Sequence, residues 1–361
     1  MNFDLSSLNP LNRKRVLGLD IGSYGIKMVH LTGRGAKRKL NAIALERISP
    51  EVIVDGTIMN ADALTQAIGE ILAVRKGLPR TVASSLGGSS VIIKQVPLPK
   101  MSSEDLFRNL AENVAEHIPF PLDEVSVDFH IIGDDRDAPD RMLTFVVAAK
   151  KDMINEYTGI ILESKLKPMV LDVDAFAVSN CFAFNYPELA EETVAIVNVG
   201  AAVTNVSVVR GGSSIFVRDI TKGGYQVTEE IQKTLGVSFE DAETFKRGGD
   251  ENSEELIPEE VGSIIRNSSQ SIADDIQRSV DYYGQMTGGE DPVKVFLSGG
   301  MALVSGMDRI IEDKVGLPVE ILNPFKQIDI NNKHIDLSLV EKNAPIFTVA
   351  VGLALREVGD L

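Results

Sequence analysis

The stretch LGLDIGSYGIKMVHL, Leu17 to Leu31, holds residues that suit phosphate chemistry. A buried strand delivers Asp20, and a tight turn with Gly22 and Ser23 follows it. Glycine in such a turn lets backbone N–H groups approach phosphate oxygens without a Cβ in the way. Lys27 follows in the next strand and is positioned to reach phosphates, while the Asp20 carboxylate would orient a magnesium-bound water. Alone, the motif also fits an ordinary β-hairpin, which needs glycines for its turn.

A second hairpin, AIVNVGAAVTNVSVV from Ala195 to Val209, repeats the pattern. Aligning Asp20 with Asn198 also aligns Gly22 with Gly200, and small residues again fill the turn. Two such hairpins from duplicated halves would face each other across a cleft and clamp a phosphate chain from both sides. The alternative is two ordinary hairpins of a mixed sheet.

Two further segments carry paired glycines. FLSGGMALVSGMDRIIEDKVG, from Phe296, is a buried strand ending at Gly299 and Gly300, and such a turn lies flat against an α-phosphate, ribose or adenine. KGGYQVTEEI, Lys222 to Ile231, opens a helix at a Gly-Gly turn. Glu243 and Lys246 then stand one helical turn apart, which for isolated residues predicts a surface ion pair.

The elements that position these motifs are alternating strands and amphipathic helices of an α/β protein. An antiparallel meander opens the chain, and a helix over Asn60 to Val74 with strands at Thr81 to Leu86 and Val91 to Val96 completes a first unit. A small α/β insertion is expected over 98–168. The strand, turn and strand pattern restarts at Thr193, and the last apolar helix spans Phe347 to Arg356.

Composition limits the partners. A formal net charge of -16 repels nucleic acid and anionic lipid, so we expect no nucleic-acid partner. No window holds eighteen uninterrupted apolar residues, which argues against direct membrane insertion. Cys181, the single cysteine, lies between apolar residues and is expected to be a packed thiol in a reducing cytosol. The four histidines lie far apart without ligand spacing, which argues against a metal enzyme.

Taken in order, the motifs resemble the phosphate-1, phosphate-2 and adenosine motifs of the actin superfamily, over nearly the whole chain. The insertion resembles the relocated subdomain of its FtsA and PilM branch. Within that branch, His117 to Phe129, Leu171 to Val178 and Ala344 to Glu357 are similar to the PilM family of type IV pilus assembly. The chain stops just after the last helix, without the amphipathic membrane-targeting helix of FtsA, and this favours PilM.

The resemblance implies an actin-like, ribonuclease H-like fold of two lobes with duplicated subdomains and an FtsA/PilM-type insertion. The expected division is 1–97 for the phosphate-1 subdomain, 98–168 for the insertion, 169–192 for the return to the first lobe, 193–224 for the phosphate-2 subdomain, 225–290 for the second lobe's outer subdomain and 291–361 for the adenosine motif and final helix.

The resemblance further implies that ATP and Mg²⁺ bind between the lobes. One wall would comprise Asp20, Gly22, Ser23 and Lys27, and the rest Asn198, Gly200, Ala201, Thr204, Gly223, Gly224, Glu243, Lys246, Gly299, Gly300 and Met301. It implies a scaffold at the cytoplasmic face of the inner membrane, held there by protein partners. Its partners would be the cytoplasmic N-terminal peptide of PilN, other inner-membrane and motor components of the pilus machine, and a second copy of the chain.

One position departs from the superfamily pattern. Its phosphate-2 motif usually begins with aspartate, and Asn198 removes that carboxylate, so we expect ATP binding with slow hydrolysis. Asp172 and Asp174 are the candidates for a general base. The alternatives are an FtsA-like division or filament-forming ATPase and a sugar-kinase-like phosphotransferase. For the partner peptide, Pro119, Phe120, Pro121 and Leu122 offer apolar surface, unless this turn only ends a helix and packs inward.

Overall fold

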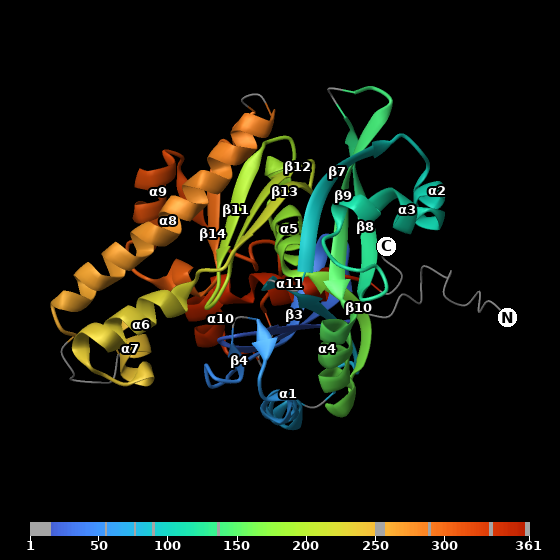
Figure 1. Ribbon diagram of the computed structural model, residues 1–361. Helices are drawn as coiled ribbons and strands as arrows, with labels where there is room; N and C mark the ends of the chain where they lie inside the picture. The colour runs from blue at the N-terminus through green and yellow to red at the C-terminus, as the bar shows by residue number, and fades with distance from the viewer. Residues whose placement is uncertain are drawn as a thin grey trace.

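The computed structural model of the chain contains two five-stranded mixed sheets and a smaller three-stranded one (Figure 1). It describes residues 16–54, 56–75, 77–88, 91–135, 138–249, 257–287, 290–331 and 335–357. Both large sheets have the same connectivity, an antiparallel meander extended on one side by parallel strands. The duplication predicted from the two hairpin motifs is therefore confirmed at the level of strand topology.

The sheet of the first lobe has the order β10-β6-β1-β2-β3. Its strands are β1 (Leu17–Gly22), β2 (Gly25–Arg34), β3 (Lys37–Arg47), β6 (Thr81–Leu86) and β10 (Lys167–Val173), with a separate short pair of β4 (Ile53–Val54) and β5 (Thr57–Ile58). Strand alternation turns Leu17, Leu19 and Ile21 to one face, where α1 (Ala61–Val74) and α4 (Lys151–Glu163) bury them. On the opposite face lie α5 (Asp174–Asn185) and α11 (Thr348–Leu355).

The helix α11 comes from the end of the chain but packs in the first lobe. A Cβ added to Gly18 of β1 would lie 2.1 Å from the carbonyl oxygen of Ala350. A Cβ added to Gly352 would lie 1.8 Å from the carbonyl oxygen of Ala177 in α5. Only glycine permits backbones to approach this closely, so these two positions fix how α11 sits against the sheet and against α5.

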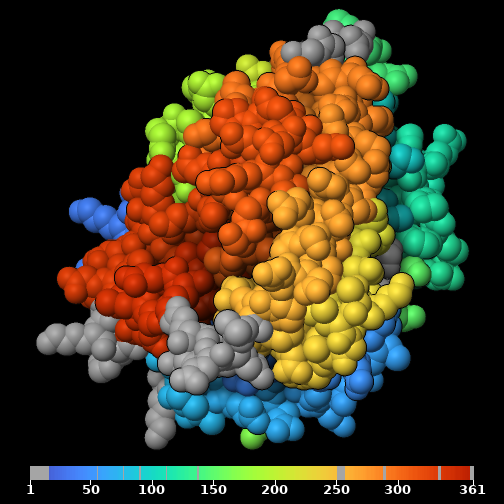
Figure 2. All heavy atoms as spheres, turned by 90° about the vertical axis from the view of Figure 1, so that its left-hand side faces the viewer, coloured from blue at the N-terminus to red at the C-terminus, as the bar shows by residue number. Residues whose placement is uncertain are grey.

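The second lobe has the sheet order β13-β12-β11-β14-β15. Its elements are β11 (Val194–Val199), β12 (Thr204–Arg210), β13 (Ser213–Ile220), β14 (Val295–Ser298), β15 (Val319–Ile321), α6 (Gly224–Leu235), α7 (Phe239–Lys246), α8 (Glu260–Thr287), α9 (Met307–Val315) and the single turns η4 (Pro187–Leu189) and η5 (Gly300–Leu303). α6, α8 and α9 bury one face of the sheet and form the outer surface in Figure 2. α5 packs on the other face, so this helix lies between the two large sheets.

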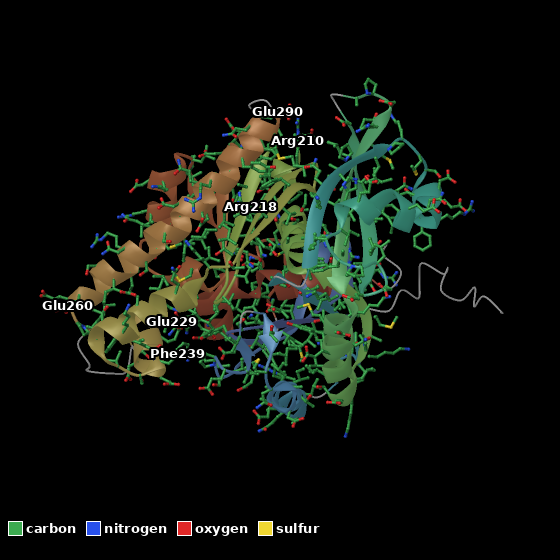
Figure 3. All side chains as sticks on the ribbon, in the orientation of Figure 1. Arg210, Arg218, Glu229, Phe239, Glu260 and Glu290 are labelled. Carbon is green, nitrogen blue, oxygen red and sulfur yellow. The ribbon has the colours of Figure 1, made fainter. Side chains whose placement is uncertain are left out.

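An ion pair ties the far end of α8 to the sheet. Arg210, at the end of β12, donates to Glu290 beyond α8 at 3.1 Å, at the opposite end of the second lobe from Phe239 of α7 (Figure 3). Both side chains are exposed, so the pair contributes under about 1 kcal/mol. The hydrophobic contacts of α8 hold it in place.

The inserted subdomain starts earlier in the chain than we predicted. β7 (Val91–Pro99) pairs along its whole length with β9 (Arg141–Lys150), and β8 (Val125–Asp134) completes the sheet β7-β9-β8. The turns α2 (Ser103–Arg108), α3 (Leu110–Val114) and η3 (Ala115–His117) cover one face. α4, in contrast, packs in the core of the first lobe. The boundary at 98 therefore cuts through a strand, and we now propose 91–150 for the insertion.

One stretch of the described chain, Leu337–Leu355, is long and apolar enough to cross a membrane, with a mean hydropathy of 1.2. It comprises α10 (Leu337–Asn343), η6 (Ala344–Phe347) and α11, and about 61% of it is buried inside the protein. Its apolar composition is accounted for by packing against the first sheet. Cys181 of α5 is fully buried, as predicted, and burial raises the pKa of its thiol.

Candidate functional site

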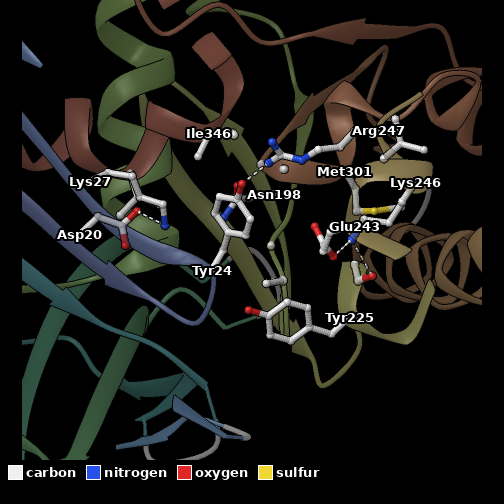
Figure 4. A pocket seen from close by; sticks show the side chains of 17 residues that line it. Asp20, Tyr24, Lys27, Asn198, Tyr225, Glu243, Lys246, Arg247, Met301 and Ile346 are labelled. Atoms are coloured by element: carbon white, nitrogen blue, oxygen red, sulfur yellow. Dashed lines mark hydrogen bonds and ion pairs between the residues drawn. The ribbon is translucent and has the colours of Figure 1, made fainter. Parts of the chain in front are cut away.

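A pocket lies between the lobes, where the β1–β2 turn faces the β11–β12 turn (Figure 4). Most of the residues predicted to bind a nucleotide line it, together with several that were not predicted. The lining is Asp20, Tyr24, Lys27, Asn198, Gly200, Ala201, Gly224, Tyr225, Glu243, Lys246, Arg247, Gly299, Gly300, Met301, Val304, Ile346 and Val349. A hollow that shares its inner end adds Gly22, Ser23 and Asp174.

On the first-lobe side, Asp20 and Lys27 form an ion pair. They stand directly opposite each other in the β1–β2 ladder, with 3.1 Å between Lys27 Nζ and Asp20 Oδ2. Both side chains are about nine-tenths buried, so the pair is held in a medium that strengthens electrostatic interactions. In this state Lys27 is paired with Asp20, and an incoming anion would compete with that carboxylate for the ammonium group.

The second hairpin places an amide pair at the equivalent register. Asn198 of β11 faces Asn205 of β12, and its Nδ2 donates to Asn205 Oδ1 at 3.2 Å. Asn205 therefore occupies the place that Lys27 has in the first half. We predicted Thr204 for this wall, but its buried Oγ1 donates to the carbonyl of Lys222, and Asn205 lines the pocket beside it. The sequence repeat held the signal, since Asn205 follows Asn198 at the spacing of Lys27 from Asp20.

Paired glycines allow the backbone to come close to the pocket. Gly299 has a φ of +85°, and a Cβ there would lie 2.3 Å from the carbonyl oxygen of Val199. Gly223 does not line the pocket as predicted. Its Cβ would lie 2.5 Å from the carbonyl oxygen of Ala201, so this glycine instead lets α6 begin against the β11–β12 turn.

Glu243 and Lys246 form a buried ion pair, whereas their helical spacing alone predicted an ion pair at the surface. Lys246 Nζ contacts Glu243 Oε1 and donates to Thr228 Oγ1 at 2.7 Å and to the carbonyl of Gly224 at 3.1 Å. Burial lowers the pKa of Lys246, and the neighbouring Glu243 carboxylate opposes that effect. These three contacts use the three N–H donors of Lys246, so the pair presents chiefly the Glu243 carboxylate beside Met301, which suits recognition of hydroxyl groups.

Side chains at the pocket mouth join the two lobes, and they were not predicted. Arg247, just after α7, donates to the hydroxyl of Tyr24 and stacks on its ring at 4.9 Å. Tyr225 of α6 donates to the carbonyl of Ser23 at 2.7 Å. Each of these contacts joins residues of different lobes, so a motif within one lobe does not predict it.

Asp174, one of the two residues predicted as candidates for a general base, lies at the inner end of the pocket. Ser85 Oγ donates to its Oδ1 at 2.5 Å, and the residue lines the same hollow as Asp20 and Lys27. Burial, followed by the charge of Asp20, raises its pKa to about 7. Asp172 lies outside the pocket lining. Its Oδ2 pairs with Arg356 Nε at 3.6 Å, so of these two residues only Asp174 lines the pocket.

The turn predicted to bind a partner peptide is divided between core and surface. Pro119 and Pro121 are exposed, whereas Phe120 and Leu122 pack against the core of the inserted subdomain. Lys150 Nζ also lies 4.8 Å from the centre of the Phe120 ring. Phe107 of α2, which was not predicted, has 72% of its surface exposed in the same subdomain.

Comparison with known proteins gives a family that is consistent with this geometry. Residues 18–358 match the family model described as type IV pilus assembly protein PilM. The chain belongs to the PilM family. This PilM-family chain superposes on a chain of the PilM–PilN type IV pilus biogenesis complex with a TM-score of 0.84 and 25% identity, covering 96% of this chain and 100% of that one.

Two more distant relatives share the fold. MreB5 of Spiroplasma citri bound to ADP aligns with the PilM-family chain at a TM-score of 0.50 and 14% identity, over 95% of both chains. The cell division protein FtsA of Helicobacter pylori is 24% identical over 242 residues, which is 59% of this chain and 47% of FtsA. The chain thus spans about half the length of the curated relative it matches. The fold is actin-like, and the chain is a type IV pilus assembly protein.

Proposed function

We propose that this PilM-family chain binds ATP with Mg²⁺ in the interlobe pocket and acts as a cytoplasmic scaffold for PilN at the inner membrane. The observation that carries the proposal is the pocket itself, where two duplicated hairpins and a Gly-Gly turn meet a buried Glu243–Lys246 pair. An actin-like relative whose structure holds ADP supports the choice of ligand.

The residues present fit a magnesium nucleotide. Gly300 lines the pocket and a Cβ there would meet no atom within 4 Å, so this turn leaves backbone uncovered for a phosphate or ribose, while Gly299 lets the turn lie against Val199. Lys27 would neutralise phosphate charge, and the Asp20 carboxylate would hold a water of the metal. Bound Mg²⁺ would supply charge neutralisation of the phosphates. Glu243 and Lys246 would bind the ribose and adenine beside Met301.

Hydrolysis is expected to be slow. Asn198 offers an amide where the superfamily has a carboxylate, so one negative group that would help order the attacking water is missing. Asp174, with its pKa raised to about 7, remains as the base and is ionised in only part of the molecules at neutral pH. Nucleotide binding would then stabilise a closed state, with the contacts at Tyr24 and Tyr225 joining the lobes.

Calorimetric titration with ATP and ADP, with and without Mg²⁺, tests the proposal. Lys27→Glu reverses the buried charge, and Gly200→Val puts a side chain 2.9 Å from the Val203 carbonyl oxygen. Both variants should lose at least tenfold in affinity. Lys39→Glu, on an exposed hairpin, and Gly262→Val, in open space on α8, are matched controls that should bind as the wild type does. Equal affinity in all five proteins would refute nucleotide binding at this site.

For the partner, we propose that the cytoplasmic N-terminal peptide of PilN binds at the inserted subdomain. An extended peptide needs apolar surface beside a strand edge, and Pro119 and Pro121 supply exposed apolar groups shortly before β8, an edge strand, while Phe107 is exposed in the same subdomain. A fluorescent PilN peptide should bind the full chain, and Phe107→Ser should weaken it. Val74→Ser, an equally exposed apolar position on α1, is the control. Loss of binding in the control alone would place the peptide elsewhere.

A further inference from the structure

A row of polar side chains crosses four strands of the second lobe behind the pocket. Asp219 of β13 faces Asn205 of β12, Asn205 faces Asn198 of β11, and Asn198 faces Ser298 of β14. Each neighbour is hydrogen-bonded to the next. Asn205 Nδ2 donates to Asp219 Oδ1 at 2.7 Å, Asn198 Nδ2 donates to Asn205 Oδ1 at 3.2 Å, and Ser298 Oγ donates to Asn198 Oδ1 at 3.1 Å.

The carboxylate at one end of the row fixes the donor and acceptor direction of every hydrogen bond in it. An ionised carboxylate only accepts hydrogen bonds, so Asn205 must turn its NH₂ group toward Asp219. Its carbonyl oxygen then faces Asn198, which must in turn donate with its own NH₂ group. The Asn198 Oδ1 is thereby left on the side of Ser298 and the Gly299 turn. Without such a neighbour, the hydrogen-bond network does not decide whether an asparagine presents its oxygen or its NH₂ group at a given place.

We propose that Asp219 is a positioning residue that acts through Asn205 to present the Asn198 amide oxygen, and not its NH₂ group, at the nucleotide pocket. The inference rests on the proposed function and deepens it. Asn198 lines both parts of the pocket, and its Oδ1 lies 2.9 Å from the position that a Cβ of Gly299 would take. Both halves of the duplicated site therefore offer an acceptor oxygen, a carboxylate at Asp20 and an oriented amide at Asn198.

Asp219 is also in contact with the first lobe. The backbone N–H of Gly88, in the loop after β6, hydrogen-bonds its carboxylate. The neighbouring Gly87 approaches Asp174 so closely that a Cβ would lie 2.3 Å from Asp174 Oδ2. An asparagine at 219 would keep an acceptor for the Gly88 N–H. The contact with the first lobe therefore survives in Asp219→Asn, while the hydrogen bonds of the row lose their fixed direction.

The test uses two variants of the full chain. Asp219→Asn is isosteric but lets Asn205 and Asn198 turn either way. The double variant Asn205→Asp with Asp219→Asn moves the carboxylate one strand along the row. There it still accepts from Asn198 Nδ2, and the new asparagine donates to it from the other side. The double variant has the same composition and net charge as the wild type, so it controls for both.

Two readouts follow from this design. In protein labelled with ¹⁵N-asparagine, the side-chain amide signals of Asn198, assigned by its replacement with serine, should shift or double in Asp219→Asn and return to the wild-type position in the double variant. The enhancement of ADP affinity by Mg²⁺, measured by calorimetry, should fall about tenfold in Asp219→Asn and recover in the double variant. A purely structural role for Asp219 predicts no such recovery.

The outcomes separate this proposal from the proposed function. Unchanged Asn198 signals in Asp219→Asn, or a double variant no better than the single one in both readouts, would overturn the role of Asp219. A wild-type chain that binds no nucleotide would refute the proposed function, and the amide signals alone would then decide whether Asp219 orients Asn198.

Discussion

Replacing Asp174 by asparagine should stabilise the protein, and the gain should grow with pH. Burial and the charge of Asp20 raise the pKa of Asp174 from 3.8 to about 7, while Ser85 donates to it and partly offsets the effect. The folded protein therefore holds this proton to a higher pH than the unfolded chain does. Between about pH 4 and pH 7 the folded state binds more protons, so the free energy of unfolding falls as pH rises.

The size of the effect follows from the difference between the two pKa values. Roughly three pKa units at 1.36 kcal/mol each correspond to about 4 kcal/mol above pH 7, and to about 2 kcal/mol at pH 5. These values are upper limits because the carboxylate keeps some contact with solvent in the pocket. Asp174→Asn removes the ionisable group, so its advantage over the wild type should grow by about 2 kcal/mol between pH 5 and pH 8.

Urea unfolding at pH 5, 6, 7 and 8 measures this difference. Loss of the acceptor for Ser85 adds a constant that does not change with pH, so the slope and not the offset carries the prediction. Asp128→Asn, on the exposed side of β8, is the control and should run parallel to the wild type. A constant difference between Asp174→Asn and wild type from pH 5 to pH 8 would refute the reasoning.

Three further predictions concern the site and the core. Asn198→Asp alone should raise ATP hydrolysis little, because the new carboxylate competes with Asp219 for the NH₂ group of Asn205. The combination of Asn198→Asp with Asp219→Asn should hydrolyse ATP several-fold faster than the wild type in a coupled assay. Equal rates for the combination and for Asn198→Asp alone would contradict this. Tyr225→Phe removes the 2.7 Å bond to the Ser23 carbonyl and should lower the free energy of unfolding by about 1 kcal/mol in urea. Cys181 should react with a disulfide reagent at pH 8 only after unfolding, since it is fully buried; fast labelling of the native protein would show the core to be open.

The helices and hairpins were predicted well because the residue patterns that indicate them lie within short segments. The helix at Ala61–Val74 begins at Asn60, whose side chain accepts from the Ala63 N–H, as the start signal indicates. The hairpin turns at Gly22 and Gly200 were found for the same reason. Glu243 and Lys246 were correctly paired from their helical spacing, but their burial depends on α6 and η5 packing over them.

What the sequence could not supply is the register between segments far apart in the chain. The pairing of β7 with β9 joins residues about 40 to 60 positions apart, and the alternation within β7 fits either sheet equally well. Asp219 reaches the pocket only through Asn205, by the register of β12 and β13. The stacking of Arg247 on Tyr24 depends on the angle between the lobes, which no single motif encodes.

The packing of α11 has a consequence for how the protein is made. The ribosome releases residues 16–185, with every strand of the first sheet and α5, long before Thr348–Leu355. Until then one face of that sheet, including the bare backbone at Gly18, lacks its cover. The first lobe therefore cannot bury this face until Thr348–Leu355 has emerged, and the nascent chain must carry an unfilled apolar face until then. A message truncated before codon 344 should yield an aggregating product, although it encodes all five strands of that sheet.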